Sequence, residues 1–192
     1  MSELGATLGL LAGGFAAKMI YDSKFSDVEY VTSNVDKRQY LVRKLDDKQE
    51  AANLLANMRM KLVKLCDHLE NNDLNNKGVY RLIKRFQPNN ITESSASEKY
   101  TSYSVNKGEK IVFCLRSRDE KKKLVNENVM MFVALHELAH IMTKSVGHTE
   151  EFWNNFRYLL KKSIEIGIYT PVDFDTKPVD YCGIKITNSP LN

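Results

Sequence analysis

The sequence predicts an α+β domain in which a small antiparallel sheet packs on one buried helix. Residues 125–142 are apolar on nearly every side, as in a helix that the rest of a domain covers. Two pairs of short segments rich in β-branched and aromatic residues, each joined by a tight polar turn, predict two β-hairpins. The 192 residues, 43% of them hydrophobic, suffice for one domain with its own core.

The amino-terminal half supplies the first hairpin and two helices. Residues 29–35 and 38–44 are expected to be its strands. A helix with an apolar stripe at helical spacing follows and ends in the polar stretch at residues 71–76. A shorter basic helix, residues 79–86, ends before Pro88.

The second hairpin directly precedes the buried helix. Residues 91–99 are rich in serine and predict a loop, after which residues 100–105 and 110–115 flank a turn that contains Gly108. We expect one of these strands to line a cleft beside the buried helix, where a free strand edge could pair with an extended peptide. The same strand could serve only as part of the sheet.

The buried helix carries the motif His136-Glu137-Leu138-Ala139-His140. Residues four apart on an α-helix lie one turn apart and about 40° apart around its axis, so both imidazoles can face one Zn²⁺ ion. Glu137 is rotated away from the two histidines, which suits a base acting on a metal-activated water better than a ligand. The alternative is a core helix whose histidines are satisfied by hydrogen bonds.

A third ligand is expected shortly after this helix. Val146-Gly147 is expected to end the helix, and His148 follows at once, so it can supply a third nitrogen. Three protein ligands with an open fourth position are typical of a catalytic zinc site. Glu150 and Glu151, in the first turn of the next helix, are alternative third ligands.

The carboxy-terminal region offers candidates for stabilising an oxyanion. Residues 168–192 contain three prolines and one expected strand at residues 181–187. Tyr158, Tyr169 and Tyr181 could each donate a hydrogen bond to a developing negative charge, or could serve only in packing.

Composition narrows the class of protein. The net charge of +4 is mildly basic and gives only weak support for DNA as a partner. Lysine clusters at residues 121–123 and 161–162 are typical of a solvated face. Three scattered cysteines are too few for a disulfide framework, and their odd number suits a reducing compartment.

The first 24 residues form an apolar, glycine-rich segment, ahead of a domain expected over residues 25–192. Residues 4–21 are long enough for a marginal membrane span, and we expect a membrane anchor there. Gly5, Gly9 and Gly13 share one helical stripe on which a second copy could pack.

The basic residues that follow this segment would place the domain on the cytosolic side of a membrane. Alternatives are a helix packed on the domain or a disordered tail, either of which would suit a soluble cytoplasmic protein.

At this point the residues resemble a known family. The motif at residues 136–140, Gly147-His148 and Phe152-Trp153 are similar to the pattern of the WLM group of zinc metallopeptidases, relatives of the SprT/Spartan proteases. The resemblance covers a metal-binding core at residues 125–166 and, more loosely, residues 29–190, in the form found in large DNA viruses. The stretch between the second and third histidines is two residues longer than in the cellular WLM proteases.

The resemblance implies a minimal zincin-like fold, with His136, His140 and His148 as zinc ligands and Glu137 as the catalytic base. It implies a zinc-dependent endopeptidase that acts on a protein or peptide. A second hypothesis is a structural or assembly protein of a virion or membrane that uses the zincin fold as a scaffold.

Overall fold

The computed structural model describes residues 27–97 and 100–191. It is an α+β domain built from four helices and three small sheets in the described residues. In chain order the elements are β1 (Val28–Thr32), β2 (Gln39–Arg43), α2 (Lys48–Asp73), α3 (Lys77–Arg85), β3 (Ile91–Glu93), β4 (Ser102–Val105), β5 (Lys110–Phe113), α4 (Glu127–Met142), α5 (Glu150–Glu165), β6 (Val179–Tyr181) and β7 (Ile184–Ile186).

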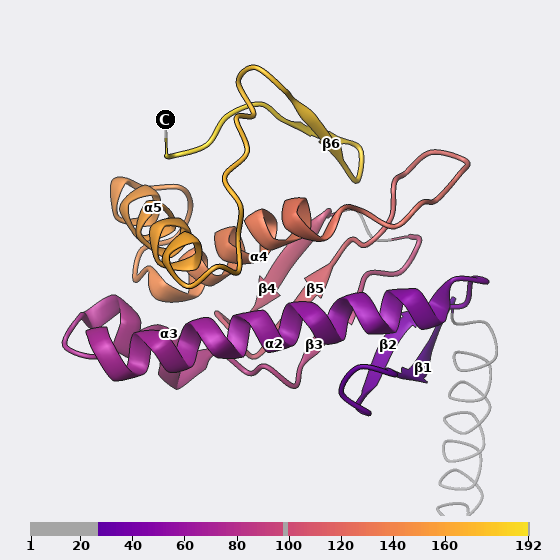
Figure 1. Ribbon diagram of the computed structural model, residues 1–192, viewed down its shortest axis with the longest axis horizontal. Helices are drawn as coiled ribbons and strands as arrows, with labels where there is room; N and C mark the ends of the chain where they lie inside the picture. The colour runs from indigo at the N-terminus through magenta and orange to yellow at the C-terminus, as the bar shows by residue number, and fades with distance from the viewer. Residues whose placement is uncertain (1–26, 98–99, 192) are drawn as a thin grey trace, which may run out of the picture.

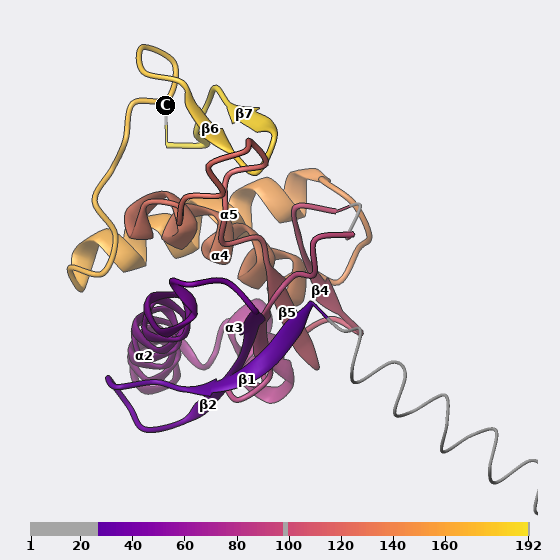
Figure 2. The same ribbon diagram turned by 90° about the vertical axis from the view of Figure 1, so that its right-hand side faces the viewer.

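Helix α4 lies in the middle of these elements. Figures 1 and 2 show α2 and the β1–β2 hairpin on one side of α4 and the β6–β7 hairpin on the other. Helix α5 and strand β4 contact α4 directly. This arrangement confirms the expected fold class, with small sheets around a buried central helix.

Helix α4 is buried because eleven of its sixteen residues are covered, including Met130, Leu135 and Ile141. It begins at the expected place, where the side chain of Asn126 accepts hydrogen bonds from two backbone N–H groups of the first turn. The expectation that it continues to Val146-Gly147 is wrong, because α4 ends at Met142. Thr143 there takes an extended backbone. The chain thus leaves the helix early enough to form the loop that carries His148.

Helix α2 provides the other large part of the core. Its apolar stripe includes Leu55, Met58, Leu62 and Leu65, all fully buried. Side chains of this size contribute roughly 1.5–3 kcal/mol each when they leave water. The stripe packs against the first hairpin and α3. The two strands and two helices that the sequence predicts for this half are therefore all present.

The central sheet is mixed rather than purely antiparallel. Its strand order is β3-β5-β4, with β4 antiparallel and β3 parallel to β5. Residues 91–93, expected in a loop, form β3, and the buried Ile91 pairs with Ile111. Tertiary pairing therefore outweighs the polar composition of this stretch. Strand β4 lies at an edge of this sheet.

The carboxy-terminal hairpin β6–β7 is fastened by a disulfide that the sequence analysis did not foresee. Cys114, just after β5, pairs with Cys182, in the turn of the hairpin. Their spacing of 68 residues gives no local signal, and only the fold brings them together. Cys66 stays a free thiol, and burial raises its pKa to about 12. The reducing compartment inferred from the odd cysteine count stays a prediction.

The expected membrane anchor and the glycine stripe fall within residues 1–26, outside the described residues. Within the described part of the chain, every helix is too short or too polar to cross a lipid bilayer.

Candidate metal centre

Three imidazoles meet at the end of α4. The Nε2 atom of His136 lies 3.2 Å from that of His140 and 3.2 Å from that of His148. Nitrogen ligands about 2.0–2.1 Å from one tetrahedral zinc ion would be about 3.3 Å apart. Among the described residues, these three form the group whose ligand atoms converge closely enough to hold a metal ion.

The surroundings keep two of these imidazoles, those of His136 and His140, neutral. Burial lowers the pKa of His136 to about 3, and the neighbouring His140 and His148 add to the effect. Burial, then His148 and Lys107, lower the pKa of His140 to about 4. A neutral imidazole has a free lone pair, which is the form that coordinates a metal. The donor set therefore fits a divalent cation such as zinc.

Helix α5 holds the rings in place with its aromatic face. The ring of His136 lies 4.9 Å from that of Phe152 and 5.3 Å from that of Phe156, measured between centroids. The ring of His148 lies 5.6 Å from that of Trp153. Thr149 begins α5 as its N-cap and accepts from the N–H of Phe152, as the sequence predicted. The imidazoles are thus oriented by packing.

Glu137 lies beside the three histidines but is buried, with 6% of its surface exposed. Burial raises the pKa of its carboxyl group to about 7, although a backbone hydrogen bond from Ser104 opposes this shift. A carboxyl group with this pKa can accept and return a proton near neutral pH. The group of convergent ligand atoms in the described residues consists of the three histidines, and Glu137 lies beside it in the same cleft.

A cleft of about 390 Å³ joins these groups to solvent. We call it the histidine cleft. One wall is strand β4, and the other holds the motif of α4 and the loop after it. Its lining residues are Ser102, Tyr103, Ser104, Lys107, His136, Glu137, His140, Ser145, Val146, Gly147 and His148. The edge strand therefore lines the cleft, as the sequence suggested.

Lys107 fixes the loop that carries His148, and sequence reasoning missed it. Its Nζ donates to three successive carbonyl oxygens, those of Thr143 at 3.0 Å, Lys144 at 2.8 Å and Ser145 at 3.0 Å. Lys107 lies in the β4–β5 turn with a left-handed backbone, φ 52°. The β4–β5 turn thus directs the side chain of Lys107 to the loop after α4, which forms the opposite wall of the cleft from β4. Nothing in the local sequence marks such a contact over 36 residues.

Glu151, a rival third ligand in the sequence analysis, has another role. Its carboxylate accepts from the N–H of Lys144 at 3.1 Å and from the N–H and hydroxyl of Ser145 at 3.3 and 3.0 Å. Neither Glu150 nor Glu151 belongs to the convergent group in the described residues. Lys107 and Glu151 thus hold the carbonyl and N–H groups of one loop.

The three tyrosines proposed for an oxyanion do not line the cleft. Tyr181 is buried, and its hydroxyl donates to the carbonyl of Cys114 at 2.8 Å and lies 2.8 Å from Oγ of Ser102. Tyr181 therefore contacts the start of strand β4 through Ser102 and does not face the cleft. Tyr103 is the tyrosine that lines the cleft.

Comparison with known proteins agrees with this geometry. Residues 74–188 match the sequence model of the WLM domain family. An uncharacterized protein of Acanthamoeba polyphaga mimivirus is 36% identical over 166 residues, spanning 84% of this chain and 83% of that protein. One from Invertebrate iridescent virus 3 is 36% identical over 89 residues, spanning 45% of this chain and 52% of its own length.

A solved structure shares the fold. The crystal structure of a Wss1 mutant from Saccharomyces cerevisiae aligns with a TM-score of 0.51 and 21% identity, over 66% of this chain and 87% of that one.

Three convergent imidazoles on a buried helix and its following loop, in an α+β domain, form a candidate metal centre of the kind expected in a metallopeptidase-type family. With its family match over more than half of the sequence, the chain belongs to the WLM domain family, in a form shared with large DNA viruses.

Proposed function

We propose that this chain is a zinc-dependent endopeptidase that hydrolyses peptide bonds in the histidine cleft. The observation that carries the proposal is the juxtaposition of three convergent imidazoles with one buried carboxyl group in the same cleft. His136, His140 and His148 would hold the metal through their Nε2 atoms. When bound, zinc would supply a Lewis acid that polarises a peptide carbonyl and lowers the pKa of water.

Glu137 would move the proton. Its carboxylate takes a proton from the attacking water and returns it to the nitrogen of the leaving amine, so that one water is consumed for each bond broken. A pKa of about 7 makes both transfers accessible near neutral pH. The burial that raises this pKa also keeps bulk water away from the carboxylate.

Strand β4 would hold the substrate. Ser102, Tyr103 and Ser104 line the cleft from an edge strand, so an extended peptide can pair with the backbone groups of this strand other than the N–H of Ser104, which bonds to Glu137. A peptide bound in this way runs past Glu137 and the three imidazoles. Backbone pairing carries little sequence information. Any preference for particular substrate side chains would therefore come from the other residues that line the cleft.

The decisive experiment compares wild type with Glu137→Gln on a peptide library and measures bound metal on both. We expect one zinc per chain in each protein and a loss of roughly 10²–10⁴-fold in hydrolysis for the variant. Full proteolysis by Glu137→Gln would refute its role. A zinc-loaded wild type that cleaves no peptide would favour the alternative of a scaffold in a virion or membrane.

A further inference from the structure

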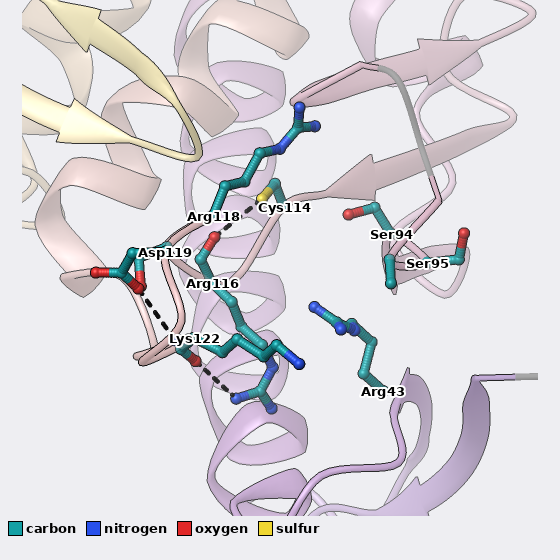
Figure 3. A pocket seen from close by; sticks show the side chains of 10 residues that line it. Arg43, Ser94, Ser95, Cys114, Arg116, Arg118, Asp119 and Lys122 are labelled. Atoms are coloured by element: carbon teal, nitrogen blue, oxygen red, sulfur yellow. Dashed lines mark hydrogen bonds between the residues drawn. The ribbon is translucent and has the colours of Figure 1, made fainter.

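A second cavity, of about 320 Å³, shares no lining residue with the histidine cleft. It lies between the end of β2, the loop after β3 and the segment after β5 (Figure 3). We call it the arginine pocket. The residues that matter for its chemistry are Arg43, Ser94, Arg116, Arg118, Asp119 and Lys122.

Cations outnumber anions among the residues that line it, which include three arginines, one lysine and a single carboxylate, that of Asp119. Three further carboxylates outside this lining, those of Asp27, Asp47 and Glu93, lie beside Arg43 and Arg116. The carboxylate of Asp119 is already engaged, accepting from Oγ of Ser117 at 2.6 Å and from the N–H of Lys122 at 3.1 Å. Hydrogen bonding to Ser117 lowers the pKa of Asp119, so this carboxylate stays ionised. Its single negative charge is smaller than the summed positive charge of the four basic lining residues.

Arg116 forms the buried floor of the pocket, with 2% of its surface exposed. Its Nε donates to Glu93 at 2.8 Å and its Nη1 to Asp47 at 2.5 Å. These two carboxylates hold the guanidinium in place but use only two of its three nitrogens. The third, Nη2, is buried and has no hydrogen-bond partner. A buried charged donor without an acceptor is costly.

Arg43 and Lys122 complete the set of donors. Nε of Arg43 is buried without a hydrogen-bond partner, and its nearest carboxylate, that of Asp27, lies 3.7 Å away. In Figure 3 the side chains of Arg43 and Lys122 point into the same gap, whereas the guanidinium of Arg118 points away from it. The hydroxyl of Ser94 faces this gap from the other side. Donors thus approach one space from three segments of the chain.

We propose that the arginine pocket binds a phosphoryl group, as inorganic phosphate or as the end of a small phosphomonoester. A tetrahedral dianion presents acceptor oxygens in several directions and can meet donors from β2, residue 94 and residues 116–122 together. A carboxylate, with two oxygens in one plane and a single charge, leaves part of this set unmatched. The site is separate from the proposed peptidase centre, and its test requires no catalytic activity.

The test is a titration of the full, zinc-loaded chain with inorganic phosphate, followed by NMR of backbone amides at pH 7 and constant ionic strength. We expect saturable shifts at residues 94–96 and 116–122. Arg43→Gln and Lys122→Gln should each weaken binding roughly tenfold, because each removes a charge-assisted hydrogen bond. Lys121→Gln, which removes the same charge outside the pocket lining, is the matched control and should change the dissociation constant less than twofold.

Further ligands distinguish the source of the phosphoryl group. Tighter binding of phenyl phosphate than of inorganic phosphate would identify a monoester as the ligand, and equal or weaker binding would identify the free ion. The proposal is overturned if acetate saturates the same residues as well as phosphate does, or if Lys121→Gln weakens binding as much as Lys122→Gln. Shifts with duplex DNA but none with phosphate would also overturn it, in favour of a nucleic-acid surface.

Discussion

Burial has opposite consequences for the basic side chains of the histidine cleft and for those of the arginine pocket. In the cleft, burial lowers the pKa of His136 and His140, so the rings give up their protons and present lone pairs. In the pocket, Arg116 is more deeply buried but carries a guanidinium that does not deprotonate in proteins. It therefore recruits carboxylates, those of Glu93 and Asp47.

The difference shows that side-chain chemistry decides what a buried basic group can bind. A buried imidazole becomes an electron-pair donor that attracts a cation. A buried guanidinium remains a hydrogen-bond donor that requires an anion. A nitrogen of this group that has no partner within the protein can still donate to a bound ligand. One small domain can thus hold a candidate site for a metal ion and a candidate site for an oxyanion within neighbouring elements.

The disulfide links these two regions and offers the largest test of their independence. Cys114 lines the arginine pocket, and Tyr181 beside Cys182 bonds to Ser102 of the histidine cleft. Because the disulfide closes a loop of 68 residues, Cys182→Ser should lower the free energy of unfolding by about 2–4 kcal/mol. Zinc stoichiometry should stay at one, since all three histidines lie outside the hairpin.

Chemical unfolding with and without a thiol reductant measures this effect. Reductant should destabilise wild type to the level of Cys182→Ser and leave the variant unchanged. Equal stability of oxidised and reduced wild type would show that the hairpin is held by packing alone. The pKa of the Cys66 thiol is raised, so this thiol should be unreactive in the folded protein. It should therefore not contribute to the difference in stability between oxidised and reduced protein.

The third metal ligand is the next largest test. His148→Ala should lower zinc affinity on the order of 100-fold, because a four-coordinate site loses one of its three protein ligands. Competition with a chromophoric chelator measures this change. Glu151→Gln, which removes a loop contact rather than a ligand, should have a smaller effect. Unchanged affinity in His148→Ala together with a large loss in Glu151→Gln would transfer the ligand role to Glu151.

The histidine site was predictable because its geometry is local. Residues 136, 137 and 140 occupy fixed places on one helix, so spacing alone predicts which of them converge. His148 was predictable from its proximity in sequence, although the helix ends at Met142 rather than at Gly147. The edge position of β4 was suggested by its place beside the helix.

The other features depend on contacts between distant residues, which one sequence does not reveal. Cys114 and Cys182 are 68 residues apart, Lys107 reaches a loop 36 residues away, and Arg116 meets Asp47 across 69 residues. The sequence predicts a loop where β3 lies, because three residues carry too little periodicity to outweigh their polar flanks. The arginine pocket has no local motif at all.

Acid should destabilise the metal-free protein through the same imidazoles. The pKa values of His136 and His140 are about 3 and 4 in the folded state, below the ordinary value of 6.5. As the pH falls from 6.5, the unfolded chain takes up protons that the folded chain refuses, so stability present above pH 6.5 is lost towards pH 4. The two imidazoles alone would cost about 4 kcal/mol between pH 7.5 and pH 5. The raised pKa of Glu137 offsets about 2 kcal/mol of this, because the folded state takes up that proton first, so we expect a net loss on the order of 2 kcal/mol.

Urea unfolding of the chelator-treated protein at the two pH values measures this loss. His140→Gln should show a shallower dependence on pH, because one of the two groups is gone. A wild type more stable at pH 5 than at pH 7.5 would mean that the imidazoles titrate normally in the folded state, because only the effect of Glu137 would then remain.

The smallest expected effect concerns Lys107, which lines the cleft and holds the loop that carries His148. Lys107→Met keeps the length of the side chain and its left-handed backbone, so the strain at φ 52° is unchanged, but it removes the three hydrogen bonds to residues 143–145. The loop should then sample more conformations and present His148 less often. We expect zinc affinity to fall about tenfold, as for other residues that orient a metal ligand. Lys107→Arg should restore part of the loss.

The matched control is Lys144→Met, which removes an exposed lysine from the same loop without a carbonyl contact from its side chain. It should bind zinc as wild type does. If Lys107→Met also binds zinc normally, the loop is held by Glu151 and by the packing of His148 against Trp153 instead. In that case the two walls of the cleft are independent, because the β4–β5 turn would no longer determine where the third imidazole lies.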